Sequence, residues 1–209
     1  MKIVFYIITC WSVFASVTLS SQSLQLTVFG LYNKTIQEEG IANAIGIQLG
    51  GFDPKKGFQV GVSYQYPIYK SFILTGEVGY LNKGHTAHVY RTNEVLYKVN
   101  YNYLYLKPSV GYQWHGFTLS GGLFFNFLLN ENAIKQKTPR GTISKTDIAY
   151  GFELSYQYKR FGLSVNTNES IRPIQELLVT GDVYEHYHHW YSLGLSYQIY
   201  NKKQKESSQ

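Results

Sequence analysis

Apolar and polar residues alternate with a period of two along most of this chain. Residues 58–80 read FQVGVSYQYPIYKSFILTGEVGY, and the alternation runs on both sides of a short interruption at 67–71. A period of two is the signature of a β-strand with two different faces. The same alternation recurs in residues 24–32, 41–51, 97–114, 117–127, 148–158, 161–165 and 191–199. The sequence therefore predicts an all-β protein.

The lengths of the connections between these segments predict how the strands are joined. Short links at 67–71, 115–116 and 159–160 alternate with long ones at 82–96, 130–145 and 168–189. Regular alternation of tight turns and long loops is typical of membrane β-barrels, with the turns in the periplasm and the loops outside the cell.

The two faces of the predicted strands decide which one meets lipid. The less apolar face carries Gly, Ser, Thr, Gln and Asn with few charges, which suits a narrow lumen better than a surface washed by water. The apolar face ends in aromatic residues beside the short turns, as an interfacial girdle requires. The predicted girdle consists of Tyr64, Tyr66, Tyr112, Trp114, Tyr156, Tyr158, Tyr197 and Tyr200. The apolar face is therefore expected to look outward to lipid.

The number of strands leaves one ambiguity at the start of the chain. Seven strands follow residue 58, and closure with both termini on one side needs an even number, so one of segments 24–40 and 41–51 joins the wall. We favour 41–51, because GIQLGG leads through Asp53-Pro54 into the next strand, and take 24–40 as an N-terminal arm, with its use as the first strand as the alternative. The prediction is an eight-stranded antiparallel transmembrane β-barrel over 41–200 with short periplasmic turns and long extracellular loops.

The strand at 97–114 needs an adjustment to keep its aromatic residues on the lipid side. Tyr101, Tyr103 and Tyr105 hold the odd parity, whereas Tyr112 and Trp114 hold the even one. Proline cannot donate to a β-ladder, so a bulge near Lys107-Pro108 would reconcile the two sets. We therefore predict a β-bulge at this position.

The first residues resemble a secretory signal peptide. One basic residue, Lys2, precedes the uncharged and largely apolar run 3–19, and small residues at 18–20 and 21–23 offer cleavage sites. A retained transmembrane helix is the alternative. The only cysteine, Cys10, lies within this segment, so a mature chain cleaved after it has no disulfide. We predict a signal peptide at 1–23, export through a Gram-negative-type cell envelope and location in the outer membrane.

Charge is mild and spread along the chain. The net charge of +6 falls by one when Lys2 leaves with the leader, and only the tail at 201–209, NKKQKESSQ, is clustered. Nucleic-acid binding needs a basic stripe on a folded surface, and a short basic tail is usually solvated. A nucleic-acid partner is therefore not expected.

Three of the predicted strands, including the last, resemble the PorT-like outer-membrane β-barrel family of Bacteroidota. The similarity covers roughly residues 45–200 and rests on a GFxxGVxYxYP pattern at 57–67, on Tyr-Leu-x-x-x-Pro at 103–108, and on a final alternating strand that closes on an aromatic residue. The chain continues past Tyr200, where many barrels end. The resemblance implies an eight-stranded outer-membrane barrel and, through the namesake, a link to secretion and gliding, but no catalytic motif and no cofactor.

The lumen of an eight-stranded barrel is filled by side chains rather than water. Glu77 and Glu153 point inward in the predicted register, and an unpaired carboxylate there is costly. We expect their partners among Lys98, Lys107 and lumenal hydroxyl groups. This lumenal polar network is expected to be structural, in preference to an ion path.

The segment 184–191, YEHYHHWY, carries the candidate chemistry. On a strand His186 and His188 share one face, and Glu185 and His189 share the other. Two histidines at this spacing fit a metal or ligand site, and histidine with Glu and Ser192 fits a hydrolytic set. An aromatic extracellular belt or hairpin, turning at 180–182, is the third interpretation.

The remaining loops carry cations without a recognisable motif. They fit either lipopolysaccharide phosphates or plain solvated loops, and the cations are Lys83, His85, His88, Arg91, Lys135, Lys137, Arg140 and Lys145. From these observations we expect a barrel without enzymatic activity that binds an envelope or extracellular partner, with lipid and lipopolysaccharide around it. The alternatives are a lipid A-modifying enzyme using 186–189 and an accessory component of a secretion or gliding apparatus.

Overall fold

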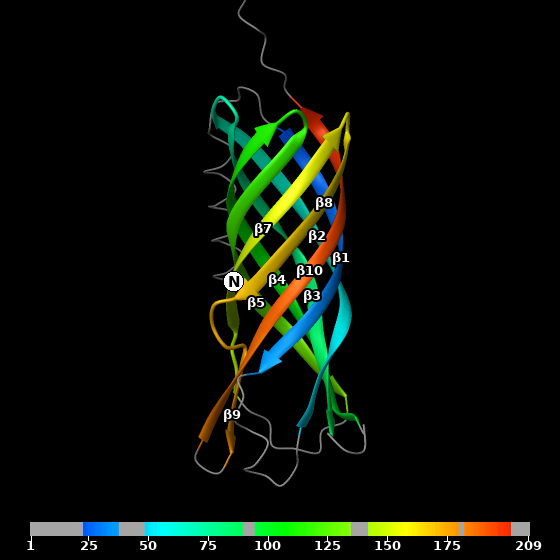
Figure 1. Cartoon of the computed structure of the whole chain (residues 1–209), viewed down its shortest axis with the longest axis vertical. Coiled ribbons are helices and arrows are strands. Elements are labelled where there is room, and N and C mark those ends of the chain that lie inside the picture. The colour runs from blue at the N-terminus through cyan, green and yellow to red at the C-terminus, as the bar shows by residue number, and fades with distance from the viewer. Residues whose placement is uncertain (1–22, 38–48, 90–94, 135–141, 180–181, 202–209) are drawn as a thin grey trace, which may run out of the picture.

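The computed structural model of the chain describes residues 23–37, 49–89, 95–134, 142–179 and 182–201, and in these ranges every regular element is a β-strand (Figure 1). None of the described residues forms a helix that is long and apolar enough to cross a membrane. The strands in chain order are β1 (Ser23–Gln37), β2 (Leu49–Tyr69), β3 (Phe72–Val89), β4 (Val95–Trp114), β5 (Phe117–Ile134), β6 (Thr142–Ile143), β7 (Thr146–Tyr158), β8 (Phe161–Ser170), β9 (Gln175–Val179) and β10 (Asp182–Asn201).

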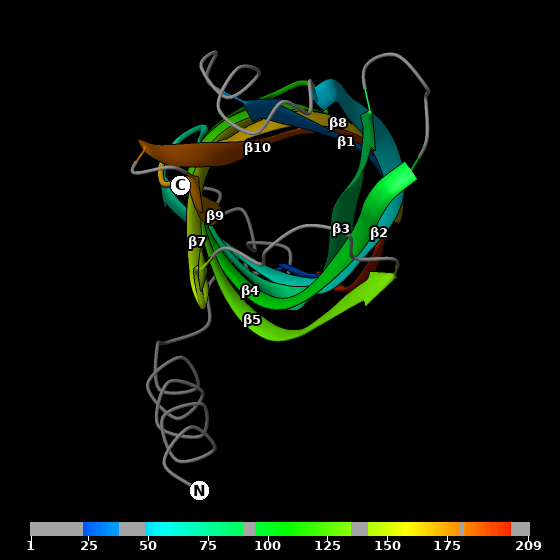
Figure 2. The same ribbon diagram turned by 90° about the horizontal axis from the view of Figure 1, so that it is seen from below.

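Eight of the described strands form a closed antiparallel barrel. Neighbours pair in the order β1-β2-β3-β4-β5-β7-β8-β10, and β10 pairs back onto β1 along fifteen residue pairs from Ser23↔Asn201 to Gln37↔His186. The end-on view shows the resulting ring (Figure 2). β9 pairs with the start of β10, and β6 with β9, so these two short strands lie beyond the wall at its loop end. The predicted fold class is confirmed.

The first wall strand differs from the favoured prediction. β1 occupies Ser23–Gln37 and pairs with both β10 and β2, so the segment taken as an N-terminal arm is the first strand, and the choice of 41–51 was wrong. Asp53-Pro54 does not separate two strands, because β2 continues from Leu49 to Tyr69 and absorbs Pro54 as an irregularity in its ladder to β3. Three segments lie outside the described residues: residues 1–22 of the predicted signal peptide, residues 38–48, and residues 202–209 of the basic tail.

The short connections are two-residue turns at one end of the barrel. They are Lys70-Ser71, His115-Gly116 and Lys159-Arg160. The predicted links at 115–116 and 159–160 are confirmed, and the link predicted at 67–71 is shorter because β2 continues to Tyr69. Lys70, His115, Gly116 and Lys159 have φ between 46° and 86°, the left-handed backbone that tight hairpins demand. At the opposite end the strands run further than predicted. β3 reaches Val89 and β5 reaches Ile134, so much of the chain expected in loops is barrel wall.

The apolar face looks outward and the small polar face looks inward, as predicted. Large side chains such as Leu119, Phe152 and Leu195 are 59 to 66% exposed on the outer wall. The inward positions are held by small polar residues, among them Thr27, Ser63, Ser109, Thr118, Ser164 and Ser192. The molecule therefore has an exterior made for lipid and a polar interior.

β4 is the exception to the predicted orientation. Tyr101, Tyr103 and Tyr105 are fully buried in the interior, while Leu106 and Val110 face outward. The β4 register against β3 runs unbroken past Lys107-Pro108, so the predicted bulge is absent. Pro108 simply points outward, and the odd positions stay inside along the strand. The three tyrosines were assigned to the wrong face because both faces of this strand are rich in large side chains.

Candidate functional site

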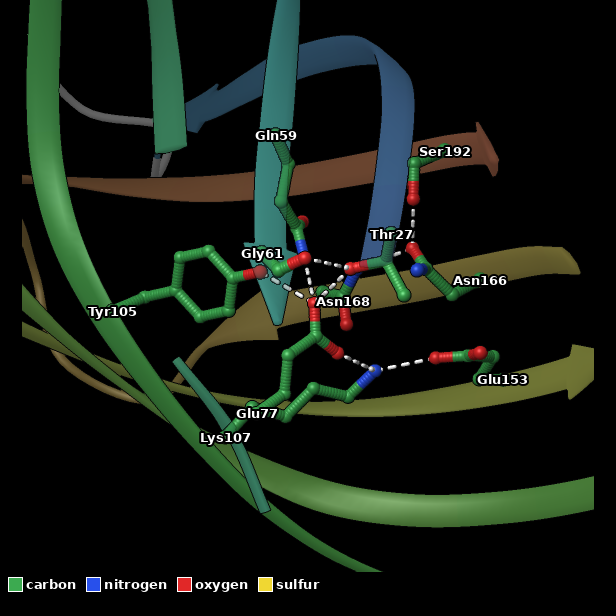
Figure 3. Close-up of polar contacts among 10 residues, drawn as sticks. All are labelled: Thr27, Gln59, Gly61, Glu77, Tyr105, Lys107, Glu153, Asn166, Asn168 and Ser192. Carbon is green, nitrogen blue, oxygen red and sulfur yellow. Dashed lines mark hydrogen bonds and ion pairs between the residues drawn. The ribbon is translucent and has the colours of Figure 1, made fainter. Parts of the chain in front are cut away.

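The lumen beside the short turns holds an ionic network centred on Lys107 (Figure 3). Lys107 on β4 pairs across the ladder with Glu77 on β3 and reaches Glu153 on β7. Its Nζ lies 3.9 Å from Glu77 Oε2, and it donates a hydrogen bond to Glu153 Oε2. Glu77 and Lys107 are almost wholly buried. The predicted pairing of both glutamates with Lys107 is thus present in the structure.

Glu77 has further partners that hold its other oxygen. Its Oε1 accepts hydrogen bonds from Thr27 Oγ1 at 2.9 Å, from Gln59 Nε2 at 3.3 Å and from the Tyr105 hydroxyl. Gly61 makes room for this arrangement, because a Cβ there would lie 2.8 Å from Glu77 Oε1 and would also collide with the Tyr105 hydroxyl. Three donors thus hold Oε1 while Oε2 faces the Lys107 ammonium group, an arrangement that fits the structural role predicted for this network.

Ser192 lies in the lumen as well, on the wall formed by β8 and β10. Its hydroxyl donates to Asn166 Oδ1, and the Asn166 and Asn168 carboxamides are 2.8 Å apart (Figure 3). Ser192 is thus turned away from His189, which is on the outer face. Ser192 therefore cannot act with His189, because residues at odd separation on a strand face opposite sides, whereas His188 shares its lumenal face; the predicted hydrolytic set of histidine, Glu and Ser192 stays a prediction.

A second buried ion pair lies nearer the loop end. Lys83 Nζ is 2.5 Å from Asp147 Oδ2, which also accepts a hydrogen bond from Asn126 Nδ2 at 3.0 Å. The ammonium group lies 4.0 Å from the centroid of the Trp190 ring and 5.1 Å from that of Tyr103. Prediction placed Lys83 in an external loop, either facing lipopolysaccharide phosphates or solvated. Both alternatives are wrong, because β3 continues through this position and Lys83 is buried in the lumen.

Aromatic side chains fill the interior between the two ion pairs. Phe124 packs edge-on against Trp190 with ring centroids 5.7 Å apart, and Tyr105 packs on Phe124 at 5.9 Å. Tyr103, Phe124 and Trp190 are fully buried. Lys107 lies on one side of this aromatic layer and Lys83 on the other, each within 5.1 Å of one of its rings. The lumen is therefore closed by packed rings between two ionic layers.

The predicted histidine segment divides between the two faces. His188 is buried in the lumen, with its ring 5.5 Å from that of Tyr101 and 5.9 Å from that of His85. His85 therefore lies inside the barrel, and its predicted place in an external loop, facing lipopolysaccharide or solvated, was wrong. For Glu185 and His186 only the backbone is described, and their candidate metal role stays a prediction. Among the described residues, no group of His, Cys, Asp and Glu could hold a metal ion.

His189 points outward and meets partners that the sequence did not suggest. Its Nε2 lies 3.4 Å from Thr167 Oγ1, and its Nδ1 lies 3.9 Å from Glu169 Oε2. The Tyr150 hydroxyl donates to the same Glu169 oxygen at 2.5 Å. These four residues come from β7, β8 and β10 and form what we call the outer histidine cluster. The signal for it was the parity of β8, which continues from Val165 to Thr167 and Glu169, although prediction ended the strand before 168.

The remaining predicted residues are placed as follows. Six girdle residues, Tyr112, Trp114, Tyr156, Tyr158, Tyr197 and Tyr200, are exposed near the short turns, and Tyr64 and Tyr66 are half-buried. Lys98 is exposed on the outward line of β4 and takes no part in the network, contrary to prediction. Lys145 is exposed at the loop end, whereas the side chains of His88, Arg91, Lys135, Lys137 and Arg140 lie outside the described residues.

Solved structures of outer-membrane barrels are similar to this chain over most of its length. OprG of Pseudomonas aeruginosa aligns with a TM-score of 0.52 at 11% identity, over 87% of this chain and 97% of that one. The Neisserial surface protein NspA aligns at 0.49 and 14% identity over 86% and 100%, and Ail of Yersinia pestis at 0.45 and 10% over 87% and 100%. No protein-family model and no curated sequence matches the chain.

The likeness to OprG, at this level of identity, concerns the fold alone. Together with the closed ladder, the apolar exterior and the aromatic girdle, it identifies the chain as an eight-stranded outer-membrane β-barrel, located in the outer membrane with strands that cross it repeatedly.

Proposed function

We propose that this protein is a non-enzymatic barrel of a Gram-negative-type envelope that presents its loop end to a protein partner. One observation carries the proposal: the interior is closed by two ionic layers and an aromatic layer, so the barrel offers a rigid wall and no path for solute. A wall of this kind acts through the surfaces at its ends.

The loop end supports a partner site because the wall is built well beyond a membrane span. β2 has 21 residues and β4 and β10 have 20 each, whereas about 9–11 residues of tilted strand cross the hydrocarbon. The β9–β10 hairpin adds to this extension on one side (Figure 1). An ordered extension of the wall is a pre-organised surface, which lowers the entropic cost of binding.

The partner is best sought by photocrosslinking in intact cells, with the crosslinker placed at one position per variant. The loop-end positions are Lys56 and Arg172, and the turn-end positions are Lys70 and Lys159, all exposed. Leu195, in the apolar lipid-facing part of the outer wall (the lipid-facing belt), is the matched background position. We expect one protein to be captured at the loop-end positions above the Leu195 background. Capture at the turn end alone would move the site to the periplasmic side, and capture no different from Leu195 at both ends would contradict the proposal.

We also propose that the chain is a PorT-like barrel and that its partner belongs to a secretion or gliding apparatus. The supporting segments are residues 57–67 in β2 and 103–108 in β4, which flank β3 in the wall. The same crosslinking experiment tests this proposal through the identity of the captured protein.

The outer histidine cluster favours a second candidate function, hydrolysis of a membrane lipid ester. Its residues follow the order of a nucleophile, a base and a carboxylate: Thr167 Oγ1 contacts His189 Nε2, and His189 Nδ1 faces Glu169. Its β7 member, Tyr150, is the ninth residue counted from the turn end at Tyr158, which places the cluster at the outer margin of the lipid-facing belt. In this reaction Thr167 would attack the ester carbonyl, pass its proton to His189 and release the alcohol with that proton; water would then free the fatty acid.

Lipid analysis tests this candidate directly. Cells carrying His189→Ala, Thr167→Ala or Glu169→Gln would be compared with wild type by mass spectrometry of total lipid A and phospholipids. The matched controls are Ser192→Ala and His188→Ala, which change lumenal groups. Loss of the same deacylated species in all three cluster variants, with both controls unchanged, would support hydrolysis. Lipid profiles identical to wild type in the cluster variants would remove it.

A further inference from the structure

The outward face of β4 changes character in a fixed order along the strand. From the turn end it presents Trp114, Tyr112, Val110 and Leu106, then Leu104. The next outward positions are Asn102 and Asn100, followed by the exposed Lys98. The 11 residues 104–114 are about one tilted span of the hydrocarbon core. The asparagines therefore begin where the acyl chains end, on the loop side of the membrane.

Neighbouring strands supply asparagines at the same two levels. Asn102 is paired with Asn82 of β3 and with Asn130 of β5, and Asn100 is paired with Asn132 of β5. Residues directly opposite each other in a ladder lie on the same face. Five carboxamides thus gather on the outer wall over three adjacent strands, and we call them the outer amide cluster.

The central row of this cluster is already ordered by hydrogen bonds. Asn82 Nδ2 donates to Asn102 Oδ1 at 2.6 Å, the Tyr80 hydroxyl donates to the same oxygen at 2.5 Å, and Asn102 Nδ2 donates to Asn130 Oδ1. Asn130 and Asn132 are exposed. Each carboxamide has two donor hydrogens and two acceptor sites. Asn102 is buried and its oxygen already accepts two hydrogen bonds, so it fixes the orientation of the row, while Asn82 and Asn130 keep capacity for another molecule.

Two further features indicate what kind of molecule fits. Phe58 of β2 is paired with Asn82, and its ring packs on Tyr80 with centroids 5.7 Å apart, so an aromatic surface borders the amides on their membrane side. Carboxamides match hydroxyl groups, which both donate and accept, better than they match charged groups. The exposed cation Lys98 follows one step further from the membrane, with Lys55 of β2 within electrostatic range of it.

We propose that the outer amide cluster binds the saccharide headgroup of a phosphorylated glycolipid of the outer leaflet. The acyl chains lie along the apolar outer wall, the sugar hydroxyls bond to the carboxamides, and Lys98 meets a phosphate by a charge-assisted hydrogen bond. The cluster lies on the outer wall, directly next to the lipid-facing apolar residues. This position favours a membrane lipid over a soluble glycan. This site lies on the wall of the barrel and is independent of a protein partner at the loop end.

The test uses the folded full-length barrel in phosphatidylcholine nanodiscs that also contain one probe lipid. The probes are lipid A with its phosphorylated glucosamine disaccharide, the same lipid without phosphates, and phosphatidylglycerol. Lipid retained by the barrel is measured by native mass spectrometry, and the Asn side-chain NH₂ resonances are followed by NMR. Asn130→Ala/Asn132→Ala is the test variant. Tyr32→Ala, on the outer face of β1, is the matched control. The difference in gel mobility between heated and unheated samples confirms that each variant is folded.

Wild type is expected to retain both forms of lipid A over phosphatidylglycerol, with shifts in the Asn NH₂ resonances. The double variant should lose about tenfold in retention, as expected for two or three neutral hydrogen bonds, while Tyr32→Ala should not. Lys98→Ala should weaken retention of the phosphorylated lipid alone. Equal retention of lipid A and phosphatidylglycerol by wild type, or equal retention of lipid A by wild type and the double variant, would overturn the proposal. Dependence on Lys98 without dependence on the asparagines would reduce it to phosphate binding and equally overturn the saccharide site.

Discussion

Lys83 and Asp147 form an ion pair across the lumen, with Nζ 2.5 Å from Oδ2 and neither side chain exposed. The pair joins β3 to β7, two strands that do not touch in the wall, and Asn126 ties it to β5. A salt bridge of this kind fixes which residues meet inside the barrel, because a shift of either strand by one residue would expose a charge to the apolar exterior.

Removing one partner of this pair is expected to destabilise the barrel strongly. Asp147→Asn or Lys83→Met leaves an uncompensated charge inside, at a cost of about 3–5 kcal/mol in the free energy of unfolding. The double variant Lys83→Met/Asp147→Asn should lose less than the sum of the two single losses. Urea unfolding of the barrel refolded into lipid vesicles measures all three, with the exposed Lys56→Met as control. Additive losses in the double variant would show that the two groups do not interact.

Replacing Gly61 even by alanine is expected to lower the free energy of unfolding of the barrel. A Cβ at this position would collide with the Tyr105 hydroxyl and lie 2.8 Å from Glu77 Oε1, so Gly61→Ala should cost about 1–3 kcal/mol through overpacking. Adding Tyr105→Phe should relieve part of the strain. Gly30→Ala is the matched control, because its Cβ would meet nothing nearer than 3.9 Å. The same urea experiment measures the three variants, and equal stability of the two alanine variants would contradict the packing described for Glu77.

The assignment of the outer wall to lipid predicts a dependence on depth. Leu195→Arg places a cation in the middle of the belt and should cost about 2–4 kcal/mol, whereas Tyr158→Arg at the girdle should cost about 0–1 kcal/mol. Leu195 and Tyr158 are 66% and 62% exposed, so side-chain burial within the protein does not explain the difference. Unfolding free energies measured in vesicles would reveal it. Equal costs in vesicles would argue against a membrane around this wall.

Much of the fold could be predicted because lipid imposes a simple rule on each strand. Outward positions must be apolar, and the two-residue period of β7, β8 and β10 therefore identified their faces and turns correctly. The rule fails where both faces carry large side chains. On β4 the sequence offers tyrosines at 101, 103 and 105 and leucines at 104 and 106, and hydropathy does not tell a lumenal tyrosine from a girdle tyrosine.

The ends of the strands were predicted less well for a different reason. Lys83, His85 and Glu169 follow an apolar span, and a charged residue there is equally consistent with a loop or with a wall that continues beyond the membrane. The choice of first strand failed similarly, because 24–32 and 41–51 both alternate and only ladder pairing distinguishes them. In the candidate site, the two-residue period was enough to predict that Glu77 and Glu153 face inward and that Lys107 is a partner. The partners of His189 could not be predicted, because they depend on the long-range pairing of β7, β8 and β10.

The central claim is that the interior is closed and the barrel acts through its surfaces, and a planar-bilayer recording tests it most directly. The purified wild-type barrel is predicted to give no unitary conductance above that of protein-free bilayers. Phe124→Ala/Trp190→Ala, which removes rings from the aromatic layer, is the positive comparison and should show channel openings if it stays folded. Reproducible wild-type channels, blocked or altered by substitutions at Lys83 or Lys107, would contradict the account and make the lumen a conducting path.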